Sequence, residues 1–312
     1  MTGSHPSTHQ STIHYIPPCI TAVSLSPPRD FPTNLVLWIG GLFDTLGHVS
    51  YPFALAQTLP ANWSLLQVTL SSSGNSWGTK TLDDDVREIA AVVRYLREGQ
   101  PGRKVVLMGH STGCQDALHY VSSSTGSSGE GPGERPRVQG IVLQAPVSDR
   151  EALVEKMDPE VYARCNEIAQ RFVEEGRQDD CLPVSVLGDV FERIGVTARR
   201  WLSLASPDGL GQDDMFSSDL PDERLGKTFG KIPQGTAMLF LYSGSDEHVP
   251  KHLKPTVFMG KWKTHAENAG AIVHPDSLKL LEGATHNLNG NPQHVVAELC
   301  TRMNRFLLLL DK

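Results

Sequence analysis

The stretch Val105-Val106-Leu107-Met108-Gly109-His110-Ser111-Thr112-Gly113 decides the fold. Its first four residues are all apolar, which is the pattern of a strand buried on both faces. The last five match Gly-x-Ser-x-Gly, and residues 114–121 have the composition of a helix. A strand, a serine between glycines and a helix together indicate a nucleophile elbow, in which a strained turn exposes the serine. We therefore expect Ser111 to be a catalytic nucleophile.

Short apolar runs recur on both sides of this stretch. They predict further buried strands at residues 35–39, 65–70, 138–145 and 237–242. A helix is expected from Thr81 to residue 96, with Thr81 and Asp84 as a capping box, and another over residues 295–310. Strands that alternate with helices imply parallel βαβ units and a doubly wound, mostly parallel sheet. With the elbow, this predicts an α/β-hydrolase fold.

The chain divides into segments of different composition. Residues 1–30 are polar at first and are expected to form a loose N-terminal arm, and residues 31–149 and 228–312 the α/β core. Residues 150–227 hold helical patterns without a comparable strand and are expected to form a helical cap inserted in the same domain. That insertion has 17 acids and 10 bases, a difference of −7 that equals the net charge of the whole chain. A Ser/Gly/Pro-rich stretch from Ser122 to Arg137 predicts a mobile surface loop.

Composition excludes several classes of protein. With 312 residues and 39% apolar residues the chain can bury a large core, while its net charge of −7 argues against a nucleic-acid partner. No apolar run approaches the ~20 residues of a membrane span, and the N-terminus lacks the apolar stretch of a signal peptide. Five scattered cysteines indicate reduced thiols, and a cytoplasmic location is expected. No metal or cofactor motif is present.

A serine nucleophile needs a histidine base and an acid that orients it, and in this fold they follow in the order serine, acid, histidine. Asp246 follows the predicted strand 237–242, and His286 lies in a loop before the last helix. We predict that His286 is the general base and that Asp246 holds its tautomer. Asp149, which also follows a predicted strand, is the alternative acid.

Two neighbours of Asp246 are weaker candidates. Glu247 adjoins it in the chain, so its side chain is expected to point elsewhere. His248 precedes Val249-Pro250 in a loop that is expected to lead away from the site. His110, inside the elbow, is expected to pack beside the site and contact substrate.

The tetrahedral intermediate of acyl transfer needs two donors for its oxyanion. One should be the backbone N–H of Thr112, directly after the nucleophile. The other should come from the loop at residues 40–44, where glycines allow close approach to substrate. Leu42 is our first choice for this donor and Gly41 the alternative, with Gly41 also expected beside the substrate. Cys114 is expected to be a buried structural thiol.

Four segments carry a family resemblance: GHSTGCQD at 109–116, ARRWLSLASPDG at 198–209, DDMFSSDLPDERL at 213–225 and LYSGSDEHVP at 241–250. Together they resemble a fungal family of intracellular α/β-hydrolases, long described only as a domain of unknown function, that includes a fusarinine C siderophore esterase. The resemblance extends from about residue 34 to the C-terminus. The first and last segments are general to the fold, and the middle two are specific.

This resemblance implies hydrolysis of the ester bonds of a hydroxamate siderophore after uptake, with release of iron. Ser111, Asp246 and His286 match the family's expected triad. Fusarinine C carries free amino groups, which an acidic cap would favour. Three residues of the insertion are candidates for apolar substrate contacts, with the cap's own core as the alternative use of each: Trp201, Met215 and Phe216.

Two other functions are also consistent with these residues. The first is a carboxylesterase, lipase or thioesterase that acts on another small-molecule ester, because one triad serves many acyl-transfer reactions. The second is a non-catalytic hydrolase-fold protein that binds a ligand or partner. Such proteins usually lack a triad member, and none is missing from this sequence.

Overall fold

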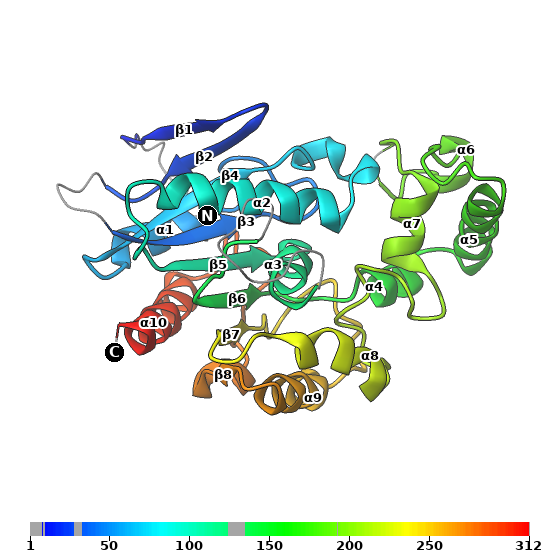
Figure 1. Cartoon of the computed structure of the whole chain (residues 1–312). Coiled ribbons are helices and arrows are strands. Elements are labelled where there is room, and N and C mark those ends of the chain that lie inside the picture. The colour runs from blue at the N-terminus through cyan, green and yellow to red at the C-terminus, as the bar shows by residue number, and fades with distance from the viewer. Residues whose placement is uncertain (1–7, 9, 28–32, 124–134, 192, 312) are drawn as a thin grey trace.

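A twisted sheet forms the centre of the protein, with helices on both of its faces (Figure 1). The computed structural model describes residues 8, 10–27, 33–123, 135–191 and 193–311. Within them the sheet has eight strands in the order β1-β2-β4-β3-β5-β6-β7-β8. Neighbouring strands from β4 to β8 are parallel, whereas β1 and β2 are antiparallel to their neighbours. The prediction of a mostly parallel α/β-hydrolase sheet is confirmed.

The strands have the following bounds: β1 Ile13–Ile16, β2 Ile20–Ser24, β3 Asn34–Ile39, β4 Trp63–Thr69, β5 Val105–His110, β6 Gly140–Gln144, β7 Ala237–Leu241 and β8 Ile272–Val273. The helices of the main body are α1 Tyr51–Thr58, α2 Leu82–Arg97, α3 Gly113–Ser122, α9 Pro255–Asn268 and α10 Gln293–Leu310. Between β6 and β7 lie α4 Asp149–Lys156, α5 Pro159–Glu174, α6 Val184–Leu187, α7 Ala198–Ala205 and α8 Asp222–Lys227. Short 3₁₀ helices are η1 Gly74–Thr79, η2 Phe229–Lys231 and η3 Pro275–Leu278.

Each face of the sheet is covered by its own apolar cluster. One cluster packs α2, α3 and α9 against the sheet, and the other packs α1 and α10 against the opposite face. Strands β5, β6 and β7 are buried along their whole length, as their continuous apolar runs predict. Among the described helices none has both the length and the apolarity to cross a bilayer.

The N-terminal segment differs from the prediction of a loose arm at residues 1–30. Residues 13–24 form a hairpin whose second strand pairs with β4, so this part of the prediction is wrong. Ile16 and Ile20 are buried in the main core, whereas Ile13 and Tyr15 are exposed. Residues 1–7, 9 and 28–32, and most of the predicted loop from Ser122 to Arg137, lie outside the described residues.

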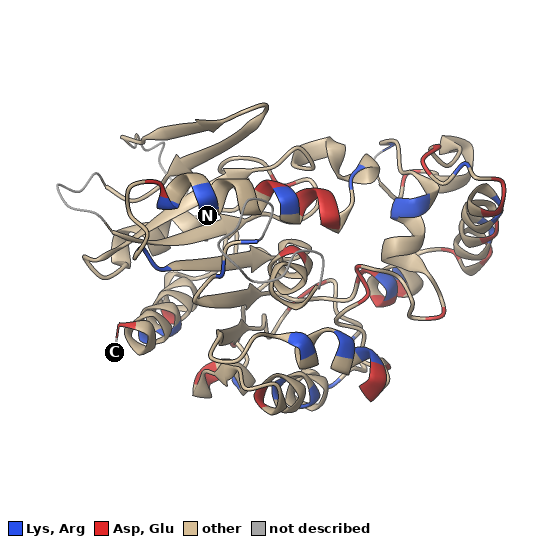
Figure 2. Ribbon diagram, in the orientation of Figure 1, with Lys and Arg blue, Asp and Glu red and all other residues tan. Residues whose placement is uncertain are grey.

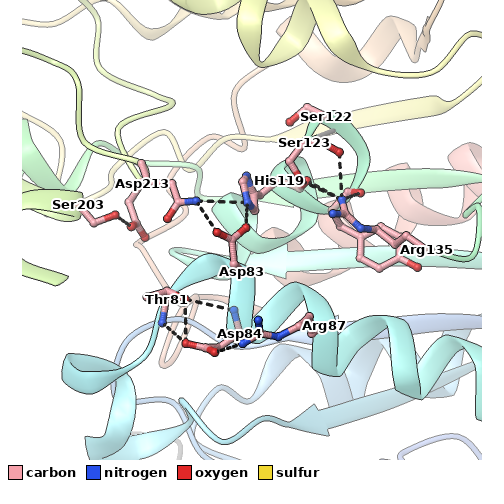
Figure 3. Close-up of polar contacts among 12 residues, drawn as sticks. Thr81, Asp83, Asp84, Arg87, His119, Ser122, Ser123, Arg135, Ser203 and Asp213 are labelled. Carbon is pink, nitrogen blue, oxygen red and sulfur yellow. Dashed lines mark hydrogen bonds and ion pairs between the residues drawn. The ribbon is translucent and has the colours of Figure 1, made fainter. Parts of the chain in front are cut away.

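The two ends of that predicted loop are ordered. Ser122 is the last residue of α3, and the buried Arg135 donates a hydrogen bond to the backbone oxygen of His119 at 3.1 Å. Figure 3 shows Arg135 reaching back to the end of α3, where it also bonds Ser123. The prediction of a mobile surface loop is therefore wrong at both ends.

The segment between β6 and β7 divides into two parts. Its first part, α4 to α7, forms a separate apolar cluster with residues such as Phe172, Phe191 and Trp201. From Met215 onward the chain packs in the main core, where Phe216 lies against Phe229 and Trp262. The cap cluster thus ends near residue 205, not at the predicted residue 227. Figure 1 shows α5, α6 and α7 lying beyond the body that contains the sheet.

The return from the cap is held on helices α2 and α3 by polar contacts (Figure 3). Gln212 donates to Asp83 of α2 at 3.2 Å, and Asp83 also bonds His119 of α3 at 2.8 Å. Helix α2 begins as predicted: the Thr81 hydroxyl accepts from the backbone N–H of Asp84, and the Asp84 carboxylate accepts from the N–H of Thr81. The chain that returns from the cap is therefore hydrogen-bonded to the first turn of α2, which the capping box fixes.

Candidate active site

The elbow at Ser111 has the strained geometry that its sequence predicts. Ser111 follows β5 directly and has φ +53°, a left-handed conformation that is unusual for a residue with a side chain. Its N–H donates to the backbone oxygen of Gln144 in β6 at 3.0 Å. A Cβ on Gly109 would lie 2.1 Å from the oxygen of Gly113, and one on Gly113 2.4 Å from the oxygen of Ile39. Both glycines are required because the backbone segments pass so close together.

His286 is held by a buried carboxylate. Its Nδ1 lies 2.8 Å from Oδ2 of Asp246, whose side chain is 1% exposed. The other carboxylate oxygen accepts from the N–H of His248 at 2.9 Å. An imidazole that donates from Nδ1 to a carboxylate leaves Nε2 free to accept a proton. The structure thus brings together the predicted acid and base, which come from loops 40 residues apart.

The surroundings of His286 differ from the prediction at two positions. Glu247 does not point away: its Oε2 accepts from the backbone N–H of His286 at 2.9 Å. The loop does not carry His248 away either, because its ring lies edge-on to that of His286 at 4.6 Å. Both residues lie near His286 for one reason. The tight turn after β7 wraps around the histidine loop, so that three consecutive residues contact it.

The loop after β3 lies against the nucleophile. A Cβ on Gly41 would lie 2.6 Å from Cβ of Ser111, so only glycine allows this approach. The N–H of Gly41 is already used, since it donates to Asp44 Oδ2 at 2.7 Å. The N–H groups of Leu42 and Thr112 have no hydrogen-bond partner among the described residues. Of the two alternatives in this loop, Leu42 is therefore the one with a free donor.

A cavity of about 550 Å³ opens over Ser111 and His286. This volume falls within the range of small-molecule sites. Its apolar wall comes largely from the cap, with side chains from α4, α7 and the segment before α7: Ala152, Leu153, Met157, Val190, Phe191 and Leu204. Its polar lining comes from the loops at the carboxyl edge of the sheet: Asp44, His48, His110, Asp149, His248 and Asn287, with Lys156 of α4 also contributing. A substrate here would meet apolar surface on one side and the catalytic groups on the other.

Four predicted substrate contacts are not in this cavity. Trp201 is fully buried in the cap cluster, where its indole N–H donates to Asn166 at 3.2 Å. Met215 and Phe216 are buried in the main core beside α9. Gly41 packs on Ser111 and does not line the cavity. These three large apolar residues of the insertion are used in packing, Trp201 within the cap and Met215 and Phe216 in the main core, whereas Phe191 and Leu204 of the insertion line the cavity.

His110 and Cys114 flank the elbow. His110 lines the cavity and its ring lies 5.0 Å from that of His286, as expected for a residue beside the site. Its Nδ1 is bonded to Gln144 Oε1 at 2.5 Å, and burial lowers its pKa well below the usual value, which keeps it neutral. Cys114 is fully buried, and burial raises the pKa of its thiol well above the usual value, so it is the expected inert structural thiol.

Asp149 also reaches the cavity but makes no hydrogen bond with His286. Its Oδ2 accepts from Gln115 Nε2 at 2.8 Å. Its pKa is raised to about 7, chiefly by burial and also by the Asp213 carboxylate, against the opposing effect of Arg200. As the acid that orients the base, Asp246 is therefore favoured over Asp149 by direct contact.

Sequence reasoning missed Asp44 and most of the cavity wall. Asp44 lies at the end of the predicted oxyanion loop, and its carboxylate accepts from Gly41 and also contacts His48 Nδ1 at 2.9 Å. A polar residue three positions after a Gly-Gly turn is a signal for such a loop-closing bond. The apolar wall had no comparable signal, because cap residues facing the cavity and residues facing the cap core have the same composition.

Comparison with known proteins relates the whole chain to one family. A family described as "Protein of unknown function (DUF1749)" matches residues 1–308. The chain is 35% identical to the fusarinine C esterase SidJ of Aspergillus fumigatus, covering 90% of both chains. It is 33% identical to the esterase AN6793 of Emericella nidulans, covering 88% of this chain and 85% of that one.

Solved structures agree with these relationships. The siderophore hydrolase EstB from Aspergillus fumigatus superposes with a TM-score of 0.84 at 31% identity, covering 99% of this chain and 100% of that one. More distant likenesses, such as Est1E from Butyrivibrio proteoclasticus with bound ferulic acid at 15% identity and a TM-score of 0.59, show the fold alone. The predicted relationship to a fungal hydrolase family is confirmed, as is the prediction of an ester-hydrolysing enzyme.

Proposed function

Because the chain belongs to the DUF1749 family and is similar to named siderophore esterases over nearly its whole length, we propose that it is a serine esterase that hydrolyses the ester bonds of a hydroxamate siderophore of the fusarinine C type. The observation that carries the catalytic part is the 2.8 Å contact of His286 with Asp246 in the cavity that also exposes Ser111. The substrate part is supported by the relatives.

The catalytic cycle follows from these positions. Ser111 Oγ attacks the ester carbonyl carbon as its proton passes to His286 Nε2, and Asp246 stabilises the imidazolium that forms. The N–H groups of Leu42 and Thr112 stabilise the oxyanion of the tetrahedral intermediate. Collapse of the intermediate breaks the bond to the alcohol oxygen, which takes the proton from His286. Water then repeats the sequence on the acyl-enzyme, which releases the acid and restores Ser111.

A cyclic or linear siderophore binds iron through several donor groups on one chain. Hydrolysis of the esters that join these groups therefore weakens its hold on iron. We place this reaction inside the cell, in the cytoplasm, where it would release iron from a siderophore after uptake. The proposed substrate is a small-molecule ester, either the free siderophore or its iron complex; no nucleic-acid or membrane partner is proposed.

A second candidate function is a carboxylesterase, lipase or thioesterase of neutral acyl groups. It is favoured by the apolar wall of the cavity, where Leu153, Met157 and Phe191 would accommodate an acyl chain. The two functions differ in which substrate is cut efficiently. A non-catalytic binding role is disfavoured because Ser111, Asp246 and His286 are all present.

The test compares kcat/KM for iron-loaded fusarinine C with that for nitrophenyl butyrate and a long-chain nitrophenyl ester. The proposal predicts that the siderophore is the best substrate and that a fluorophosphonate probe labels Ser111. Efficient cleavage of the nitrophenyl esters without siderophore cleavage would support the second candidate. If neither reaction nor labelling occurred, the protein would not be a serine hydrolase.

A further inference from the structure

Asp149 occupies an unusual place in the cavity. It is the first residue of α4, and it lines the same cavity as Ser111 and His286. One carboxylate oxygen accepts from the buried amide of Gln115 at 2.8 Å. Within the described part of the chain, the other oxygen has no hydrogen bond or ion pair. The carboxylate is therefore fixed in position with one oxygen left for a ligand.

The basic side chains around Asp149 already have other partners. Arg200 binds both carboxylate oxygens of Asp213, at 2.7 and 2.6 Å, with both side chains buried. Lys156 of α4 also lines the cavity, and its Nζ lies 2.6 Å from His248 Nδ1. No described cation therefore forms an ion pair with Asp149, although the charge of Arg200 partly offsets the rise in its pKa.

Arg150, the residue after Asp149, is likewise engaged. Its Nε donates to Asp214 at 2.6 Å, and its terminal nitrogens bind Asp219. Asp213 and Asp214 both raise the pKa of Asp149, in addition to the larger effect of burial. An ionised carboxylate in such a setting is unfavourable unless a positive group arrives to pair with it.

Other acids of the cap, unlike Asp149, form ion pairs at the surface. Figure 2 shows acidic and basic residues interleaved along the insertion. Several form exposed ion pairs within it, such as Asp179 with Arg199 and Asp189 with Arg193. A helix N-terminus favours an acid at the Asp149 position. That preference explains the acidic residue, but it does not explain why an acid with an unpaired oxygen lines the cavity that also exposes the nucleophile.

We propose that Asp149 is a specificity residue that selects esters carrying an ammonium group near the scissile bond. It rests on the proposed esterase function. The ammonium donates a charge-assisted hydrogen bond to the unpaired oxygen of Asp149 while Ser111 faces the carbonyl carbon. The apolar wall contacts the uncharged remainder of the substrate. An ester whose amine is acylated leaves the carboxylate unpaired and is a poorer substrate.

The test uses two simple amino esters, the ethyl esters of 3-aminopropanoic and 6-aminohexanoic acid, each compared with its N-acetyl derivative. Products are measured by mass spectrometry. We expect wild type to prefer at least one amine over its acetylated partner by roughly tenfold to a hundredfold in kcat/KM, the range of one charged hydrogen bond. Asp149→Asn keeps an oxygen to accept from Gln115 and is expected to bring that ratio close to one, chiefly by raising KM for the amine.

The matched control is Glu155→Gln, which removes the same charge from an exposed position on the same helix. It is expected to keep the wild-type ratio. A far-UV circular dichroism spectrum and a urea unfolding curve like those of wild type show that Asp149→Asn is folded. A wild-type ratio near one for both amines would overturn the proposal, as would a ratio that Asp149→Asn leaves unchanged.

This result is separable from the proposed siderophore activity. Preference for simple amino esters, lost in Asp149→Asn, supports the role of Asp149 even if fusarinine C is not cut. Cleavage of fusarinine C at equal rates by wild type and Asp149→Asn, with no amine preference, keeps the esterase and removes Asp149 as its selector.

Discussion

Gly41 is a position where adding a single methyl group is expected to lower catalytic activity. A Cβ at this position would lie 2.6 Å from Cβ and 3.1 Å from Oγ of Ser111. We expect Gly41→Ala to displace either the nucleophile or the loop that carries Leu42 and to lower kcat at least about a hundredfold, the effect of losing an oxyanion donor. Steady-state kinetics on a nitrophenyl ester measure this.

The matched control for Gly41→Ala is Gly226→Ala in α8, where a Cβ would meet no atom within 4 Å. It should keep full activity. Wild-type kcat in Gly41→Ala would show that the loop is not part of the catalytic machinery.

The two acids at the cavity are expected to have different roles. Asp246→Asn places an amide opposite His286 Nδ1 and is expected to lower kcat on a neutral ester by about 10²–10⁴, because the imidazole loses its orienting acceptor. Asp149→Asn is expected to leave kcat on the same ester within a few-fold of wild type. If Asp149→Asn lost more activity than Asp246→Asn on this substrate, Asp149 would be the acid of the triad.

At this scale, the positions of residues set by local sequence context were predictable. Ser111 is identified by its glycines, which the close backbone approaches at Gly109 and Gly113 require. Asp246 and His286 follow from strand ends and chain order. Trp201, Met215 and Phe216 could not be assigned in this way, because a large apolar side chain gives the same signal whether it lines a cavity or fills a core.

Helices α2, α3 and α7 meet at a cluster of buried charges. Asp85 of α2 and Asp116 of α3 are both buried, each with one carboxylate oxygen that has no hydrogen-bond partner in the described structure, and Arg200 of α7 is bound to Asp213 beside them. Burial raises the pKa of Asp85 from 3.8 to about 7 and that of Asp116 well above its usual value. This cluster lies behind the oxyanion loop and lines a small cavity with Leu42 and Thr112.

A pH dependence of stability follows from Asp85. Between about pH 4 and pH 7 the folded protein keeps this proton while the unfolded chain has released it, so the free energy of unfolding falls as pH rises. Asp85→Asn removes this contribution. Relative to the variant, wild type is expected to lose roughly 1–3 kcal/mol of stability between pH 5 and pH 8. Urea unfolding at the two pH values measures the difference.

The exposed Glu98→Gln at the end of the same helix is the control and should parallel wild type at both pH values. A constant difference between wild type and Asp85→Asn would mean that Asp85 is ionised in the folded protein.

Elements with strong periodicity were also predictable. Helix α2 was expected from apolar spacings of three and four and from its capping box, and both features are present. The hairpin of β1 and β2 was not expected, because its strands are short and its outer residues Ile13 and Tyr15 are exposed. Such an edge hairpin is fixed by pairing with β4, a long-range contact that local patterns do not contain.

In the whole molecule, the sheet and the cap contribute different parts of the site. The sheet's carboxyl edge supplies Ser111, Asp246 and His286 from three separate loops, as expected for an open α/β sheet. The cap supplies the apolar wall from α4 and α7 and is tied to the core through Gln212. The alternation of strands and helices predicted this plan. The end of the cap was predicted too late in the chain, because residues 215–227 are helical in pattern yet pack on α9.

The proposed reaction is the cleavage, by Ser111 of this protein, of the ester bonds of a hydroxamate siderophore. The most direct measurement incubates iron-loaded fusarinine C with wild type and with Ser111→Ala and follows the products by mass spectrometry. We expect linear trimer, dimer and monomer products from wild type, and a rate at least about 10³-fold lower for Ser111→Ala. An intact siderophore after incubation with an active wild-type enzyme, or equal rates for both proteins, would contradict it.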